Sequence, residues 1–234
     1  MIQAKLLWTD LVTLPTVDSA MSAIAATYDF KTHPYLLWMQ ADTTDAAGFR
    51  QSQLPFRFAV ESFSQALAAV LARIPSLEQR LPLFLNVAEE HGNGDRQMSH
   101  KASFQQYLEA LGATAADLET PCPTPIFAFN QSVLTYCLTQ EVPPGAALLG
   151  AIEFLYVGIS ATIAHTILER GWVAPGSQSH YSTHERLDTH HSADLLALTA
   201  TAWDQRDGRQ AIAQSLLLGA YYFWRLYDEL LPSQ

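Results

Sequence analysis

The stretch that decides the fold runs from Pro143 to Arg170 and reads PPGAALLGAIEFLYVGISATIAHTILER. Two prolines at its start suit the first turn of a helix, and a long apolar run follows them. A membrane span usually needs ~18 uninterrupted apolar residues, whereas this run contains Glu153 and His165 and has no basic flank at its start. A charge near mid-span would be costly in lipid. We therefore expect a helix that is buried on most of its faces inside a soluble bundle.

Helical signals continue on both sides of this run, and strand signals do not. Residues 56–73 carry apolar side chains at helical spacing, and Ser76 with Gln79 reads as a capping box that opens a helix to His91. After the long run, we expect one helix over 180–203, a break at Asp207-Gly208 and a last helix over 209–231. The pattern predicts an all-α protein of about seven to nine helices.

Composition narrows the function classes. The 234 residues suit a single domain, 1–234, with a large core. A net charge of −10 and the absence of any Lys/Arg cluster argue against a nucleic-acid partner. Cys122 and Cys137 form no disulfide framework and no CxxC pair. Because the N-terminus also lacks the pattern of a signal peptide, we expect a cytoplasmic protein.

Three residues near the C-terminal end of the chain have the spacing of metal ligands on a helix. His184, Asp188 and His191 stand at positions i, i+4 and i+7, so two imidazoles and a carboxylate share one helix face. Such donors suit a first-row metal. His180 lies one turn earlier on the same stripe, and His190 points elsewhere. The alternative is a solvated polar face that gathers histidines by chance.

Carboxylates in other helices favour the metal. Glu153 is the only acidic residue in the apolar centre of its helix, and a buried carboxylate is costly unless it is paired, protonated or metal-bound. Glu89-Glu90 closes one expected helix, and His100 opens the next after a Gly-rich turn. Glu61 lies between Val60 and Phe63. Carboxylates on separate helices, joined by the His/Asp/His set, are typical of a dimetal site in the core of a bundle.

The same residues carry a family resemblance. Asn86-Val87-Ala88-Glu89-Glu90-His91-Gly92, followed by His100, Glu153 and the run from His184 to His191, resembles the ligand pattern of the haem-oxygenase-like diiron oxidases and oxygenases. These are relatives of thiaminase II, pyrroloquinoline-quinone synthase and the chlamydial death-domain-associating protein. The resemblance covers roughly residues 50–231. Its ligand order, Glu, His, Glu and His-x3-Asp-x2-His, implies the metal ligands Glu90, His100, Glu153, His184, Asp188 and His191, with Glu89 as the alternative to Glu90.

The resemblance also implies a fold, a cofactor and a reaction class. It implies an all-α haem-oxygenase-like helical bundle that holds two iron ions (Fe²⁺/Fe³⁺), with manganese as the alternative metal, and dioxygen as co-substrate. The expected reaction oxidises a small organic substrate, such as an amine or amino-acid-like compound, by N-oxygenation or C–C cleavage. Family members that oxygenate nitrogen have an extra glutamate where Glu61 stands, which implies a catalytic role for it; the alternatives are a carboxylate that accepts a hydrogen bond from a ligand histidine, and a surface residue. A homodimer is expected, with no membrane partner.

Two other functions stay open from the sequence. A thiaminase-like hydrolase on the same fold would need a nucleophilic cysteine, for which Cys137 is the candidate, although its neighbours supply no activating base. The other is a non-catalytic metal-binding, cofactor-binding or interaction protein, for instance a haem binder, whose single axial histidine would not require the other five residues. Most aromatic residues are expected to pack the core; the prominent ones are Phe56, Phe63, Phe104, Tyr107, Phe154 and Tyr156.

Overall fold

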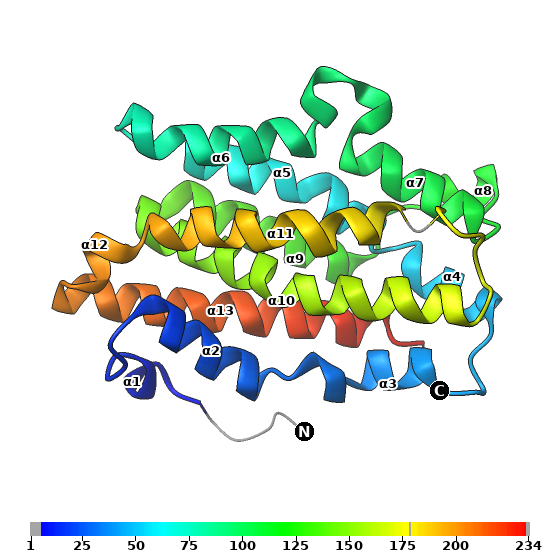
Figure 1. The fold of residues 1–234 in the computed structure, drawn as a ribbon, viewed down its shortest axis with the longest axis horizontal. Coiled ribbons are helices and arrows are strands. Elements are labelled where there is room, and N and C mark those ends of the chain that lie inside the picture. The colour runs from blue at the N-terminus through cyan, green and yellow to red at the C-terminus, as the bar shows by residue number, and fades with distance from the viewer. Residues whose placement is uncertain (1–5, 178, 233–234) are drawn as a thin grey trace.

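A computed structural model describes residues 6–177 and 179–232, with the side chains of all of them except 179 and 182–189. The described chain is an all-α bundle without a strand, as expected (Figure 1). Eight of its α-helices have eleven or more residues. The elements in chain order are α1 (Trp8–Leu11), α2 (Val17–Thr27), η1 (Phe30–Thr32), α3 (Pro34–Gln40), α4 (Ala46–Gln53), α5 (Arg57–Leu71), α6 (Leu77–Glu90), η2 (Gly92–Gly94), η3 (Arg96–Met98), α7 (His100–Ala110), α8 (Ala115–Leu118), α9 (Thr124–Thr139), α10 (Val142–Glu169), α11 (Ser179–Ala197), α12 (Ala200–Trp203) and α13 (Arg206–Leu230).

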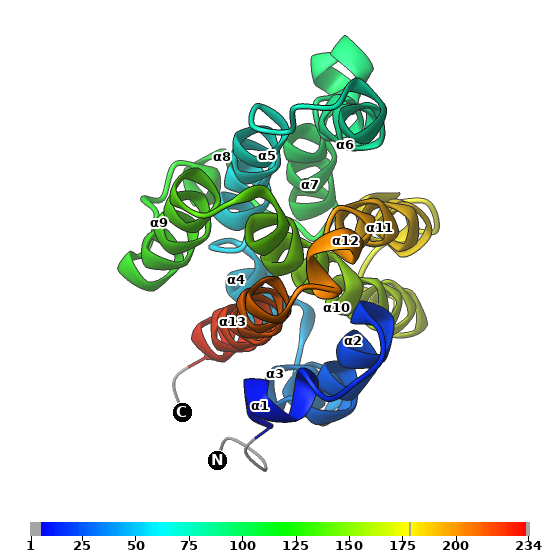
Figure 2. The same cartoon turned by 90° about the vertical axis from the view of Figure 1, so that its left-hand side faces the viewer.

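Helix α10 is the centre of the bundle. It packs most extensively against α11 and α13, and Figure 2 shows other helices around it on several sides. By length and hydropathy α10 resembles a membrane span, but 72% of its most apolar window is buried inside the protein. Burial of that surface favours folding by roughly 25 cal/mol per Å² of apolar area. The mostly buried α10 is therefore the core helix that the sequence predicts.

Close packing of α10 on α13 depends on a glycine. A Cβ at Gly219 in α13 would lie 2.4 Å from the carbonyl oxygen of Leu148 and 3.2 Å from the Cβ of Ala151, both in α10. These distances are shorter than van der Waals contact, so no larger residue fits without moving one helix. Gly219 therefore sets how closely the two central helices approach.

Side-chain caps start the helices that lead to the site. The Ser76 hydroxyl accepts a hydrogen bond from the backbone N–H of Gln79 and begins α6. In the same way, Ser99 accepts from Ala102 and begins α7. An N-cap of this kind stabilises a helix by about 1 kcal/mol. The capping residues thus start α6 and α7 where the sequence predicts, after Ser76 and at His100.

The C-terminal helices differ from the sequence prediction. The single helix expected over 180–203 is divided into α11 and α12, which are separated at residues 198–199. The expected break at Asp207-Gly208 is wrong, because both residues lie in the first turns of α13. A Cβ at Gly208 would lie 2.3 Å from the carbonyl oxygen of Ala202. This glycine permits a close approach to α12 and does not end a helix.

A buried polar network anchors the N-terminal part of α11. The Tyr181 hydroxyl donates to Oε1 of Gln53 over 2.5 Å, and Nε2 of Gln53 donates to the Tyr35 hydroxyl over 2.6 Å. All three side chains are fully buried. Burial also raises the pKa of the Tyr181 phenol well above its usual range, so it stays neutral. The network ties the N-terminal end of α11 to α3 and α4, and the histidines at positions 184, 190 and 191 come later in the same helix.

Candidate metal centre

The last turn of α6 brings two glutamates to the centre of the bundle. Glu90 is only 6% exposed, whereas the neighbouring Glu89 side chain is 36% exposed. After Glu90 the chain reverses through Gly92, Asn93 and Gly94, all with positive φ. A Cβ at Gly92 would lie 2.6 Å from the backbone of Met98. This glycine-dependent turn returns the chain to α7 beside the end of α6.

The turn places His100, the first residue of α7, against Glu90. Nδ1 of His100 lies 2.8 Å from Oε1 of Glu90, and both side chains are buried. The pairing joins the two residues that the sequence predicts as ligands on either side of the Gly-rich turn. An imidazole and a carboxylate therefore face the same interior space from α7 and α6.

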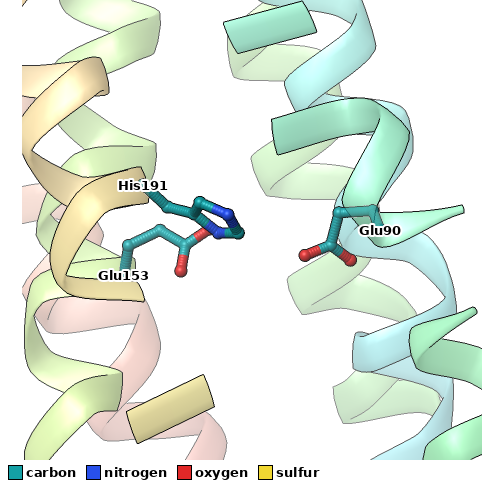
Figure 3. A group of neighbouring side chains, drawn as sticks. All are labelled: Glu90, Glu153 and His191. Carbon is teal, nitrogen blue, oxygen red and sulfur yellow. The ribbon is translucent and has the colours of Figure 1, made fainter. Parts of the chain in front are cut away.

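Glu153 and His191 approach this space from α10 and α11. Glu153 is 3% exposed and His191 is 2% exposed. Nδ1 of His191 lies 3.9 Å from Oε1 of Glu153. One ligand atom each from Glu90, Glu153 and His191 lie within 4.8 Å of one another. Figure 3 shows the Glu90 carboxylate facing His191 and Glu153 from the opposite side, so donors from three helices converge on one point.

Glu89 contacts His191 from outside this group. Its Oε2 lies 2.8 Å from Nε2 of His191, while Nδ1 of the same ring is turned towards Glu153. The sequence presents Glu89 and Glu90 as alternatives for one role. In the structure each has its own imidazole partner, Glu90 with His100 and Glu89 with His191. This division is not among the sequence predictions; the signal for it is the adjacency of two acidic residues where a helix ends.

The other sequence candidates lie as follows. The side chains of His184 and Asp188 are outside the described ones. Glu61 in α5 is 45% exposed and forms an ion pair with Lys101, so it does not join the buried group. His190 is exposed, in agreement with its expected direction away from the cluster. His180 is buried, with Nδ1 at 2.9 Å from the Ser103 hydroxyl oxygen and its ring centroid at 6.0 Å from that of His100.

An apolar pocket opens beside the convergent donors. Its volume is about 40 Å³, which admits roughly three water molecules. Glu90, His100 and Glu153 form its polar wall. The other lining residues are Phe56, Ala59, Val60, Phe63, Phe129, Ile152, Tyr156, Phe223 and Leu226. Three of the aromatics expected to serve core packing, Phe56, Phe63 and Tyr156, therefore line a pocket.

A polar contact with His180 orients the Tyr156 ring in this pocket wall. Its hydroxyl lies 3.5 Å from Nε2 of His180, whose other ring nitrogen contacts Ser103 in α7. The rings of Tyr156 and Phe56 are 6.0 Å apart between centroids, in a tilted arrangement that is common for buried aromatic pairs. His180 thus connects the wall of the pocket to the helix that carries His100.

Comparison with known proteins decides the family. Residues 55–226 match the family described as iron-containing redox enzymes, which is most of the chain and includes every residue of the site. The chain belongs to this family. No curated protein matches the sequence at a significant level.

Several solved structures share the fold at low sequence identity. A TenA homologue from Pseudomonas syringae pv. tomato is similar with a TM-score of 0.72 and 13% identity, over 97% of this chain and 98% of that one. A domain of unknown function with a haem-oxygenase-like fold from Shewanella denitrificans has a TM-score of 0.70 and 12% identity, over 97% and 93%. A CADD-like protein of unknown function from Nostoc punctiforme has a TM-score of 0.65 and 16% identity, over 96% of each chain. The haem-oxygenase-like fold that the resemblance implies is therefore confirmed.

Proposed function

We propose that the protein is a cytoplasmic, non-haem diiron oxidase or oxygenase that uses dioxygen to oxidise a small organic substrate, such as an amine or amino-acid-like compound. The observation that carries the proposal is the convergence of Glu90, Glu153 and His191, with ligand atoms within 4.8 Å, beside an apolar pocket. Membership of a family of iron-containing redox enzymes supports it. Oxidation by N-oxygenation or C–C cleavage is the reaction class that the family resemblance favours.

The donor set fits iron. Two buried carboxylates in an apolar bundle would be costly unless their charge is compensated, and a divalent cation compensates both. Carboxylates and imidazoles are hard-to-borderline donors suited to iron or manganese. The free thiols do not line the pocket. We propose that Glu90, His100, Glu153 and His191, together with His184 and Asp188, would hold two irons.

The protein's own residues would supply position and a dry environment. When bound, iron provides the redox chemistry with dioxygen, because no protein side chain does so alone. The apolar lining of the pocket excludes bulk water from the reacting end of the substrate. Glu89 would fix the orientation of the His191 ring by contacting Nε2 of His191. Carboxylates that do not touch the metal orient many metal-bound histidines in this way. Tyr156, whose hydroxyl contacts His180, would shape the pocket wall.

Anaerobic loading with ferrous iron, followed by metal analysis, tests the proposal. We expect up to two irons per chain, and loss of at least one in His191→Ala, because its imidazole is buried at the convergence point. His184→Ala is expected to behave in the same way. His190→Ala and His165→Ala are matched controls on exposed histidines and should keep most and all of the metal, respectively. Equal iron content in all of these variants would reject the site.

The thiaminase-like hydrolase is the second candidate, and the structure offers it little. Cys137 is fully buried in α9 and lies outside the residues that line the pocket. Burial raises the pKa of its thiol to about 12, so the thiolate needed for nucleophilic attack is scarce near neutral pH. Cleavage of a thiamine analogue by the metal-free protein would favour this candidate over the oxygenase.

A further inference from the structure

A buried histidine far along the chain from the metal centre attaches the N-terminal helices to the bundle. His33 lies between η1 and α3 and is fully buried. Figure 2 shows α2 and α3 on one side of the bundle, where α3 packs on α13. Nδ1 of His33 accepts a hydrogen bond of 3.0 Å from the backbone N–H of Tyr35 and caps α3. Nε2 of the same ring lies 3.1 Å from the carbonyl oxygen of Trp224 in α13.

These two contacts require opposite roles from the two ring nitrogens of His33. A carbonyl oxygen only accepts, so Nε2 must carry a hydrogen, and a backbone N–H only donates, so Nδ1 must offer its lone pair. The neutral imidazole with its hydrogen on Nε2 satisfies both contacts. A proton on Nδ1 would set one N–H against the N–H of Tyr35 and leave the first turn of α3 without its cap.

The surroundings of His33 favour the neutral ring. Burial has the largest effect and lowers the pKa of the imidazole below its usual 6.5, although the Trp224 carbonyl and Asp228 act in the opposite direction. Oδ1 of Asp228 lies 3.4 Å from Nε2. The same carboxylate also pairs with the Arg225 guanidinium over 2.8 Å. Because its charge is shared in this way, Asp228 does not outweigh the burial of the ring.

The other ionisable groups around the ring are neutral or directed elsewhere. Burial raises the pKa of the phenols of Tyr28, Tyr35 and Tyr227, so they stay uncharged near neutral pH. Asp29 accepts a hydrogen bond from the backbone of Lys31 at the start of η1, and the Lys31 side chain is exposed. Helix α10 also packs on η1, and the α10 residues that line the groove between them are uncharged.

We infer that His33 is a pH-sensitive switch: the neutral ring holds η1 and the start of α3 on α13, and a proton on Nδ1 releases them. The other end of α3 does not respond to pH in this range. There the Arg170 guanidinium, which stays protonated, donates to the carbonyl oxygens of Gln40 and Ala41. Release is therefore local and centred on residues 28–36.

Release reaches the pocket beside the metal centre through Phe30. The Phe30 ring stacks on the His33 ring with 5.3 Å between centroids, and it lies 5.8 Å from the Phe223 ring. Phe223 lines the pocket, so the loss of Phe30 removes support from one pocket wall. Residues of η1 also border a groove of about 500 Å³ over α10, which release widens. The switch goes beyond the proposed function and does not depend on it, because these contacts of His33 involve no proposed metal ligand.

The direction of the pH dependence follows from the lowered pKa of His33. Above about pH 6.5 the ring is neutral in both the attached and the released state, so attachment keeps its full stability. As the pH falls below 6.5, the released ring binds a proton first, and attachment loses stability until the attached ring is protonated too. One proton changes this equilibrium by at most about tenfold for each pH unit.

Hydrogen exchange of the full-length, metal-free protein tests the inference, measured by mass spectrometry from about pH 8 to about pH 5. After correction for the intrinsic pH dependence of exchange, the protection of residues 28–36 should be constant down to about pH 6.5 and then fall by up to about tenfold for each pH unit. Residues 37–41, which Arg170 holds, should keep their protection. Constant protection of residues 28–36 over the whole range would overturn the inference.

Three variants identify the titrating group. In His33→Asn the amide oxygen can still accept from Tyr35 but does not titrate, so the fall in protection should disappear. His165→Asn, on the exposed surface of α10, is the matched control and should keep the fall. Arg225→Ala leaves the Asp228 charge free to favour the protonated ring in the attached state, so the total fall should be smaller. An unchanged fall in His33→Asn would assign the titration to another group and reject the switch.

The unmodified protein offers a measurement that needs no variant. A long-range ¹H–¹⁵N nuclear magnetic resonance spectrum distinguishes the two neutral tautomers of a histidine from the imidazolium. At about pH 8 the His33 ring should carry its hydrogen on Nε2 and none on Nδ1. A hydrogen on Nδ1 at that pH would contradict the cap on α3 and overturn the inference.

Discussion

At the scale of single residues, the two adjacent glutamates at the end of α6 divide their roles. Successive residues on a helix point about 100° apart, so Glu90 enters the core while Glu89 stays half-exposed and reaches His191 from the side. A carboxylate that accepts a hydrogen bond from the ring nitrogen of a metal-bound histidine that faces away from the metal typically strengthens metal binding about 10–100-fold. Glu89 is thus a positioning residue in the proposed centre.

Substitution of Glu89 should weaken iron binding in a graded way. We expect about a tenfold loss of iron affinity in Glu89→Gln, whose amide oxygen can still accept from His191, and a larger loss in Glu89→Ala. Anaerobic iron titration measures both. Glu169→Gln is the matched control, because Glu169 pairs with a histidine, His165, on the exposed surface of α10. Unchanged iron affinity in Glu89→Ala would exclude the positioning role.

The Cys137 thiol should be almost inert. Its pKa rises from 9.0 to about 12 because burial disfavours the thiolate. At pH 8 we expect iodoacetamide to alkylate it at least about 100-fold more slowly in the folded protein than in denaturant. Mass spectrometry of a Cys122→Ser variant isolates this site, and rapid alkylation would restore the hydrolase candidate.

The raised pKa of the Cys137 thiol also affects stability. The folded state loses stability as pH rises above about 9, because the thiol ionises first in the unfolded chain.

Residue spacing predicts part of the site and leaves part of it undetermined. The structure places Glu90, His100, Glu153 and His191 near one another, and these are four of the six residues that the family resemblance implies as ligands. Their role as metal ligands stays a prediction. A direct catalytic role for Glu61 stays a prediction. Its exposure follows from helix geometry, because Glu61 lies about 200° round α5 from the buried Ala59. The pairing of Glu61 with Lys101 was not readable, because spacing within one helix does not indicate which helix packs beside it.

At the scale of helices, glycines show why boundaries are harder to predict than helices themselves. Gly92 ends α6, as predicted, because its positive φ suits a turn. Gly208 was interpreted as a break, but it permits a contact with the backbone of Ala202. A glycine is used for a left-handed backbone or for a close approach, and one sequence does not distinguish the two uses. The presence of a long helix is predicted from periodicity over many residues, which is a more robust signal than a single glycine at a boundary.

The close approach of α10 and α13 gives a prediction at this scale. Gly219→Ala would place a methyl group 2.4 Å from the carbonyl oxygen of Leu148, and we expect a loss of about 1–3 kcal/mol in the free energy of unfolding. Gly158→Ala is the matched control in α10, because a Cβ there has no atom within 4 Å and the residue is exposed. It should raise stability by up to about 1 kcal/mol through better helix propensity. Denaturant unfolding measures both, and equal effects would contradict this packing.

At the scale of the whole molecule, α6 presents an apolar stripe to solvent. Leu77, Leu81, Phe84 and Leu85 are each between 49% and 57% exposed and follow helical spacing. Figure 1 shows α6 at the outer edge of the bundle, and its opposite face packs on α5 and α11. Contiguous exposed apolar residues of this kind usually mark a contact surface. Because the stripe lies along one helix, two copies can pair it antiparallel about a two-fold axis.

We therefore expect the homodimer predicted from the sequence to form through α6. Sedimentation at micromolar concentration should give twice the chain mass of 25.9 kDa, and Leu81→Glu with Phe84→Glu should give monomers, because each charge would be desolvated against its symmetry mate. Leu138→Glu, at an equally exposed position on α9, is the control and should remain dimeric. A monomeric unmodified protein would reject the dimer, and a dimer that persists in the double variant would reject this interface.

Pairing through α6 should also affect iron binding. Since α6 ends in Glu89 and Glu90, pairing would immobilise one of the helices that supply the proposed metal centre. The monomeric double variant should therefore bind iron more weakly than the unmodified protein.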